Sequence, residues 1–318
     1  MGLWKLRLSM AGTLAIIFGL STLVFTVILS LAGLGFNLLT MGIFVVCFNI
    51  IQWLLAPYIV GALYRVKELP QSENPQLHQM VDTLSQKSGI TRPKLMIAQI
   101  PLPNAFAYGS PISGSRIAVT QGLLKTLDEG EVEAVIGHEL GHLRHRDVQV
   151  MMVVSFLPAL FYYIGFSLMW SGNSRDKNGS GNNALFGIAF MAFSWILNLF
   201  ILYLSRLREY YADRHSVSVV ENGVQKLSSG LAKIVHSTQR TSRTKKETHN
   251  LNGFKALFIA DPDKANTDSA TLATMQASYQ NLVQEILAKE PTLTDKIIEA
   301  LSTHPNIVKR LRALQQLN

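Results

Sequence analysis

Long uncharged segments alternate with polar ones along this chain. Residues 8–64 contain no Asp, Glu, Lys or Arg, and two further uncharged runs cover residues 148–174 and 178–205. A helix that crosses the hydrocarbon core of a bilayer needs about 20 residues, so the first run is long enough for two helices. Glycines and an asparagine at 33–37 predict the turn between them. The pattern indicates two membrane hairpins, although the second pair could instead be buried helices of a soluble domain.

The polar segments, 65–147 and 206–318, are expected to fold together as one catalytic domain. The hairpins would then occupy 1–64, as a membrane anchor, and 148–205. Apolar spacing predicts a helix near 77–87, and runs rich in apolar residues predict strands at 94–98, 104–109 and 116–120, the last two joined by a turn. Residues 206–220 should continue the fourth apolar helix. We interpret the basic stretch 236–253 as a mobile loop and the tail after 270 as helical.

Charge changes this picture in two ways. Charged residues make up 16% of the chain and hydrophobic residues 48%, against about 25% charged in soluble domains, which favours a protein partly in lipid. Of the 29 Lys and Arg residues, only Arg175 and Lys177 lie in the link between the third and fourth runs. Short cytoplasmic loops collect Lys and Arg, so we expect a multi-pass protein of the cell membrane with a cytoplasmic catalytic domain. Topology thus explains the net charge of +8 without a nucleic-acid partner.

The residues that carry chemistry begin at His138. Asp128 is placed to cap a helix whose first turn is acidic, and this helix carries His138-Glu139-Leu140-Gly141-His142. Histidines four apart project from the same helical face and can bind one zinc ion. Glu139 can then act as a general base on a water that the metal activates. The alternative is two ordinary surface histidines.

A third zinc ligand must come from elsewhere in the chain. The metzincin pattern requires glycine at 145 and histidine at 148, whereas this chain has His145 and Val148, so that class is excluded. Glu209 is the best candidate, because it follows the fourth apolar run just as the motif precedes the third. Asp213, one helical turn later, can accept a hydrogen bond from the second N–H of a ligating imidazole. Either acid could instead pair with neighbouring arginines at 206, 208 or 214.

Four segments together resemble a known family. They are Asn104-Ala-Phe-Ala, the zinc motif with Asp147, Arg208-Glu-Tyr-Tyr-Ala-Asp213 and Thr303-His-Pro305. In this order, with two hydrophobic hairpins, they look like the HtpX family of membrane zinc metalloproteases within the M48 peptidases. The resemblance implies a mainly α integral membrane protein with helical hairpins and an α+β zincin-type (gluzincin) catalytic domain containing a small sheet.

The resemblance also implies roles for individual residues. Glu209 would be the third ligand of one zinc ion per chain, and Asp213 its outer partner. Asn104 and Ala105 would lie on an edge strand that pairs with extended substrate. His304 would help to stabilise the oxyanion. The family further implies that the substrates are polypeptides, namely damaged or misfolded membrane proteins, cleaved at the cytoplasmic side of the bilayer.

Two rival interpretations remain. Relatives of the CAAX prenyl proteases share the metal motifs, but that family has more membrane spans than the four apolar runs seen here. A non-catalytic membrane scaffold would bind metal structurally or not at all. Structural zinc needs a closed fourth position, and the single cysteine, Cys47, lies within the second apolar run, so no cysteine is available to close it.

Overall fold

The computed structural model describes residues 38–171, 180–244, 283–284, 287–288, 290 and 292–317. The described chain is mostly helical with one small mixed sheet. It divides into two compact units, one made of residues 1–48 and 159–194 and the other of residues 49–158 and 195–318. The predicted first apolar helix, the turn at 33–37 and residues 245–253 of the predicted loop lie outside the described residues.

The sheet belongs to the second unit and contains four strands in the order β1-β2-β4-β3. Strands β2 (Lys94–Ala98), β3 (Ala105–Ser110) and β4 (Gly114–Thr120) confirm the three predicted strands. The sheet is mixed, because β2 runs parallel to β4 while β3 and β1 (Val66–Glu68) pair antiparallel. Strand β1 was not predicted, since three residues are too short for an alternating pattern to show.

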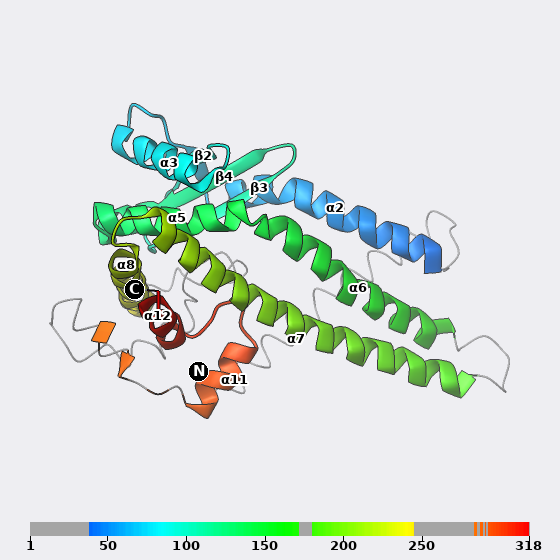
Figure 1. Cartoon of the computed structure of the whole chain (residues 1–318). Coiled ribbons are helices and arrows are strands. Elements are labelled where there is room, and N and C mark those ends of the chain that lie inside the picture. The colour runs from blue at the N-terminus through cyan, green and yellow to red at the C-terminus, as the bar shows by residue number, and fades with distance from the viewer. Residues whose placement is uncertain are drawn as a thin grey trace. The chain divides into compact units, whose positions relative to one another are not determined.

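Helices cover one face of the sheet. Figure 1 shows α5 (Glu129–Arg144) running beneath the strands, with α3 (Pro75–Ser88) beside it. Alternate side chains of β2, β3 and β4 join this core with the apolar faces of α3 and α5 and of α8 (Gly223–Thr244). The short helix α4 (Gln121–Thr126) follows β4 directly. The helix predicted near 77–87 is confirmed by α3.

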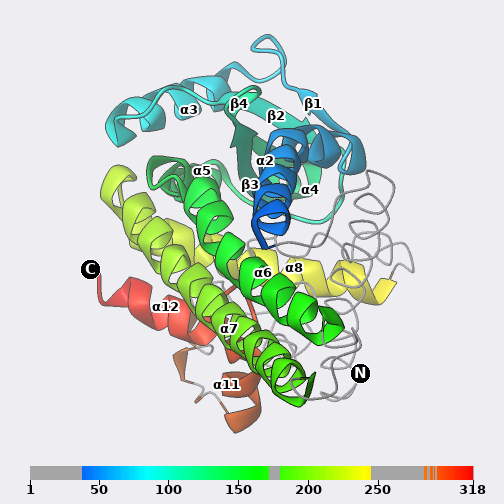
Figure 2. The ribbon, with the colours of Figure 1, turned by 90° about the vertical axis from the view of Figure 1, so that its right-hand side faces the viewer.

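The opposite face of the sheet carries a second, smaller core. Phe106 of β3 packs on Tyr64, with ring centroids 5.3 Å apart, and Tyr108 lies 5.5 Å from Phe106. Val60 joins them from the end of α2 (Leu38–Leu63). The last turn of α2 therefore packs against the sheet, as Figure 2 also shows.

Two helices are long and apolar enough to cross a membrane by length and composition. They lie within α6 (Asp147–Ser171) and α7 (Ser180–Val219) and cover Asp147–Met169 and Ala184–Val219. In the first unit these helices approach closely: a Cβ placed on Gly165 would lie 2.5 Å from the Gly187 carbonyl oxygen. The prediction that the helix after the fourth run continues towards residue 220 is confirmed by α7.

The C-terminal segment returns to α7 in the second unit. Helices α11 (Leu293–Ala300) and α12 (Ile307–Gln315) agree with the predicted helical tail. Residues 270–282 of that prediction lie outside the described residues. Arg206 of α7 donates hydrogen bonds to three carbonyls at the end of α11, those of Glu299, Ala300 and Ser302. Such donors satisfy carbonyls that have no partner within a helix, so Arg206 fixes the segment that leads into α12.

The predicted loop at 236–253 is wrong in its first part, because residues 236–244 continue helix α8. The basic composition hid an amphipathic pattern. Leu227, Leu231, Ile234 and Val235 are buried at helical spacing, and Thr238 continues that buried face. Lys226 and Lys233 lie off this buried face, as expected for a surface helix.

Candidate metal centre

Helix α5 presents the two motif histidines side by side. Asp128 caps the helix and forms a reciprocal capping box with Glu131, which confirms the predicted start. Ten and fourteen residues after Asp128, His138 and His142 point their Nε2 atoms at each other across 3.2 Å. Two ring nitrogens that face each other this closely share one position where a cation can bind both.

Helix α7 brings Glu209 to this position because α5 and α7 pack at very short range. A Cβ on Gly141 would lie only 3.0 Å from the Cα of Ala212, so a larger residue there would push the two helices apart by a few tenths of an ångström. The Glu209 carboxylate lies 3.8 Å from His138 Nε2 and 3.5 Å from His142 Nε2. The predicted third ligand thus lies beside the histidine pair.

The three groups fit a tetrahedral zinc ion. Ligands about 2.0–2.2 Å from one zinc at tetrahedral angles lie roughly 3.3–3.6 Å from each other. The two histidine nitrogens are 3.2 Å apart, and Glu209 approaches His142 through Oε1 at 3.5 Å and His138 through Oε2 at 3.8 Å. These separations lie close to that range, although the carboxylate offers a different oxygen to each ring. His138, Glu139 and His142 also form a group that can hold a metal ion, with ligand atoms within 4.8 Å of one another. A cation bound by the two histidines and Glu209 would have three protein ligands, the number found in catalytic zinc sites, whereas structural sites have four.

Asp213 takes the outer position predicted for it. Its Oδ1 lies 2.9 Å from His138 Nδ1, which leaves Nε2 directed at the metal position. The alternative of pairing with neighbouring arginines does not describe this acid, because its arginine partner is Arg310 of α12. Arg310 contacts Asp213 through Nε and Nη2, both at 2.6 Å, and lies 3.2 Å from Glu209 through Nη1.

Sequence reasoning missed Arg310. Its side chain is only 2% exposed, so a guanidinium is buried between two carboxylates. One signal was available: Arg310 falls on the apolar face of α12, among Ile307, Leu311 and Leu314, all of which are buried. A charge on such a face predicts a buried partner of opposite charge, but the sequence does not say which.

Strand β3 forms one side of the site. It is an edge strand, and the backbone N–H of Ala107 donates to Glu139 Oε2 at 2.8 Å. Backbone groups alternate in direction along an antiparallel strand, so Ala105 also faces away from β4. Asn104 faces the other way, since its carbonyl accepts from the Thr120 N–H at 2.9 Å. The side chain of Asn104 is buried.

His304 also reaches the metal centre. Its Nδ1 lies 3.3 Å from Glu209 Oε2, in the segment between α11 and α12 that Arg206 fixes. No pattern in the sequence distinguishes this histidine from the others; only the family resemblance pointed to it. The structure places it beside the third predicted ligand.

Burial changes the protonation of the motif. It raises the pKa of Glu139 to about 7; the charge of Glu209 adds to the rise, and that of His142 opposes it. Burial alone would lower the pKa of His142, but the hydrogen bond to Asp147 and the carboxylates of Glu209 and Glu139 raise it overall. Near neutral pH the metal-free site therefore holds protons that a cation must displace.

Comparison with known proteins identifies the family. The model described as "Peptidase family M48" matches residues 71–318. This chain belongs to peptidase family M48. It is 36% identical to the "Protease HtpX homolog" of Thermoplasma acidophilum, over 100% of this chain and 99% of that protein. It is 37% identical to "Protease HtpX homolog 2" of Saccharolobus solfataricus, over 99% and 98% of the two chains. The resemblance drawn from the motifs is confirmed.

One solved structure is also similar in fold. The structure titled "Crystal Structure of S. mikatae Ste24p" superposes with a TM-score of 0.55 at 18% identity, covering 98% of this chain and 66% of that one. At this identity the likeness concerns the fold. The chain spans about two thirds of the length of that protein.

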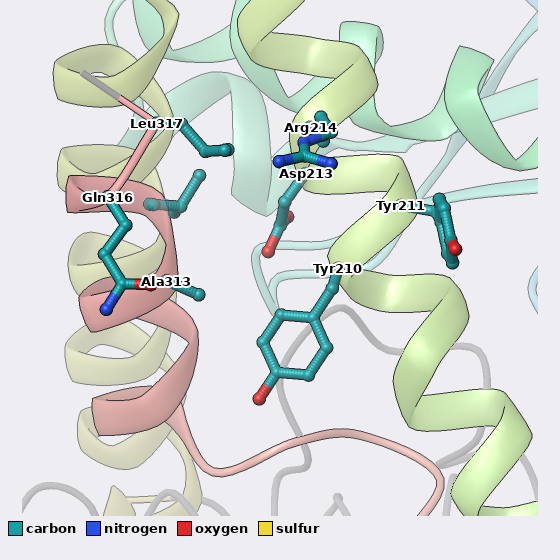
Figure 3. Close-up of a pocket in the computed structure, with 8 residues that line it drawn as sticks. Tyr210, Tyr211, Asp213, Arg214, Ala313, Gln316 and Leu317 are labelled. Carbon is teal, nitrogen blue, oxygen red and sulfur yellow. The ribbon is translucent and has the colours of Figure 1, made fainter.

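The candidate metal centre differs from the cavity shown in Figure 3. That pocket, of about 330 Å³, lies between α7 and α12. Its lining includes Tyr210, Tyr211, Asp213 and Arg214 from α7 and Ala313 and Leu314 from α12. Of the metal-site residues only Asp213 borders it, and its carboxylate is already held by His138 and Arg310. The pocket therefore lies beside the metal centre rather than at it.

Metal binding to this M48 family member should release protons. Metal-free Glu139 titrates near pH 7 and His142 above its usual value, and a cation favours the deprotonated form of both. Apparent zinc affinity should therefore fall as pH drops from 8 to 6, by up to about tenfold per unit for each proton displaced. Calorimetry in buffers of different ionisation enthalpy would count the protons. A count that is the same at pH 6 and pH 8.5 would contradict these assignments.

Proposed function

We propose that this chain is a zinc-dependent endopeptidase that is anchored in a membrane and hydrolyses peptide bonds on the cytoplasmic side. The observation that supports this best is the convergence of His138, His142 and Glu209, with pairwise contacts of 3.2–3.8 Å, beside the buried carboxylate of Glu139. These groups come from two helices that are separated in sequence by an apolar hairpin.

The chain supplies the acid–base chemistry. A bound zinc ion would polarise the scissile carbonyl and lower the pKa of a water molecule towards about 7. Glu139 accepts the proton of the attacking water and later gives it to the leaving amine. The Ala107 N–H keeps the carboxylate in place.

His304 and strand β3 serve the substrate in this proposal. His304, next to Glu209, donates a hydrogen bond to the carbonyl oxygen as negative charge develops on it. An extended substrate adds to the free edge of β3 and bonds to the backbone of Ala105, with Asn104 closing the start of that edge. Such backbone pairing accepts many sequences, which suits unfolded polypeptides.

The membrane part of the proposal rests on the apolar helices. Large apolar side chains of α7, among them Phe186, Trp195 and Phe200, are exposed in the structure. Exposed residues of this size, on a helix long enough to span a bilayer, indicate contact with lipid. Lys and Arg flank the apolar runs on the side of the metal site, so the site faces the cytoplasm. Damaged or misfolded membrane proteins are the substrates that this position favours.

The proposal predicts that activity depends on a removable metal. Full-length protein in detergent, incubated with an unfolded membrane polypeptide, should produce internal fragments. A zinc chelator should abolish cleavage, because the attacking water would be activated by the metal. One equivalent of zinc should restore cleavage. Elemental analysis should find about one zinc per chain. Cleavage that survives complete metal removal would reject the mechanism, and protein that binds no zinc would favour a non-catalytic scaffold.

A further inference from the structure

The second motif histidine has a carboxylate partner of its own. His142 Nδ1 lies 2.5 Å from Asp147 Oδ2, and the Asp147 side chain is only 6% exposed. This contact repeats the one between His138 and Asp213 on the other ligand. A carboxylate on Nδ1 holds the proton there and leaves the Nε2 lone pair directed at the metal.

Each of these carboxylates is held by an arginine. Arg310 holds Asp213, and Arg208 Nε lies 3.0 Å from Asp147 Oδ2. The Arg208 side chain is mostly buried, at 18% exposure, so its position is restricted by packing. It directly precedes the predicted ligand Glu209 in α7. One turn of α7 therefore acts on the metal position in two ways. Glu209 lies beside it, and Arg208 contacts Asp147, which in turn contacts His142.

The chain adopts an unusual backbone conformation to bring Asp147 back to His142. Helix α5 ends near His145, and Arg146 takes a left-handed conformation with φ of 53°. This conformation is costly for a residue with a Cβ. It turns the chain so that Asp147 becomes the first residue of α6, five positions after the histidine that it contacts.

We propose that Asp147 and Arg208 are positioning residues for the metal ligand His142. Asp147 sets the tautomer and the ring orientation of His142, and Arg208 acts only through Asp147, by holding its carboxylate. The pair also joins the first residue of α6 to α7 at the metal site. The inference rests on the proposed function, since it requires that the site bind a metal.

Zinc affinity of the full-length protein in detergent, measured by competition with a chromophoric chelator, tests this proposal. Removing an outer carboxylate from a metal-bound histidine typically costs about 10–100-fold in affinity, so Asp147→Ala should lose that much. Asp147→Asn, which keeps the size and one acceptor, should lose less. Arg208→Met should weaken binding in the wild-type background but have no further effect in the Asp147→Ala background. Cobalt in place of zinc should show a changed visible spectrum in the Asp147 variants.

The chain offers a matched control. Asp82 and Arg92 form the same kind of contact, Nε to carboxylate at 2.8 Å, and Arg92 lies 2.6 Å from His78 Nδ1. Asp82→Ala and Arg92→Met should leave zinc affinity unchanged.

The outcomes separate the two proposals. If the wild-type protein binds no zinc, the proposed function fails. The positioning proposal is wrong if the wild-type protein binds zinc and both Asp147→Ala and Asp147→Asn bind it with wild-type affinity. It is also wrong if Arg208→Met weakens binding as much in the Asp147→Ala background as in the wild-type background. Should Asp147→Ala not fold, Asp147→Asn and Arg208→Met decide through affinity and the cobalt spectrum.

Discussion

Glu139→Gln should abolish peptide hydrolysis while leaving zinc bound. General base catalysis contributes about 10²–10⁴-fold to a rate. The other carboxylates of the described site have different roles in the proposal: Glu209 is a metal ligand, and Asp213 and Asp147 hold the histidine rings. Glutamine has the same shape and keeps a side-chain oxygen. This oxygen can accept the hydrogen bond from the Ala107 N–H that Glu139 Oε2 accepts at 2.8 Å in the wild-type protein. The variant should therefore fold, and above pH 7 it should be at least as stable, because a buried charge is removed.

The measurement compares initial cleavage rates with zinc content at fixed protein concentration. Glu133→Gln is the matched control on the same helix. Glu133 pairs with Lys226 at the partly exposed surface, an interaction worth about 1 kcal/mol or less, so its rate should stay close to the wild-type value. Wild-type turnover in Glu139→Gln, or loss of zinc from it, would show that Glu139 does not have the role assigned to it.

Arg310→Met should destabilise the metal-free protein strongly. The guanidinium is buried with Asp213 at 2.6 Å and Glu209 at 3.2 Å, and removal of one member of a buried ion pair costs about 3–5 kcal/mol. Arg310→Lys keeps the charge but not the planar fork, so it should lose less. Added zinc should recover part of the free energy of unfolding in Arg310→Met, because the cation neutralises Glu209.

Thermal unfolding in detergent, with and without zinc, checks this result. Arg312→Met lies two positions further along α12. It removes a contact with Glu290, which is largely exposed, and a hydrogen bond to the Leu287 carbonyl. Its effect on the free energy of unfolding should be about 1 kcal/mol or less. A small effect for Arg310→Met, equal to that of Arg312→Met, would mean that the two buried carboxylates do not depend on this arginine.

Several elements were predictable because their signals are local. The start of helix α5 could be placed from Asp128 and the acidic first turn, since the capping residue and the residues that it bonds lie within four positions of each other. The strands β2, β3 and β4 followed from short apolar runs bounded by turn residues. The stretch 236–244 was misjudged because its basic residues were counted while the buried face from Leu227 to Thr238 was not.

The sequence by itself determined the chemistry on offer: an i, i+4 histidine pair on one helical face, a carboxylate between them, and apolar runs long enough for membrane helices. Spacing within one helix decides these features, and spacing can be read from sequence. Only the tertiary structure decided which distant charges meet there. Arg310 lies 97 residues from Asp213 in the sequence, and the apolar runs at 148–174 and 178–205 separate Arg208 from Asp147. Their pairing depends on how closely α5, α6, α7 and α12 pack, and because the contacts between these helices are non-local, no local pattern encodes them.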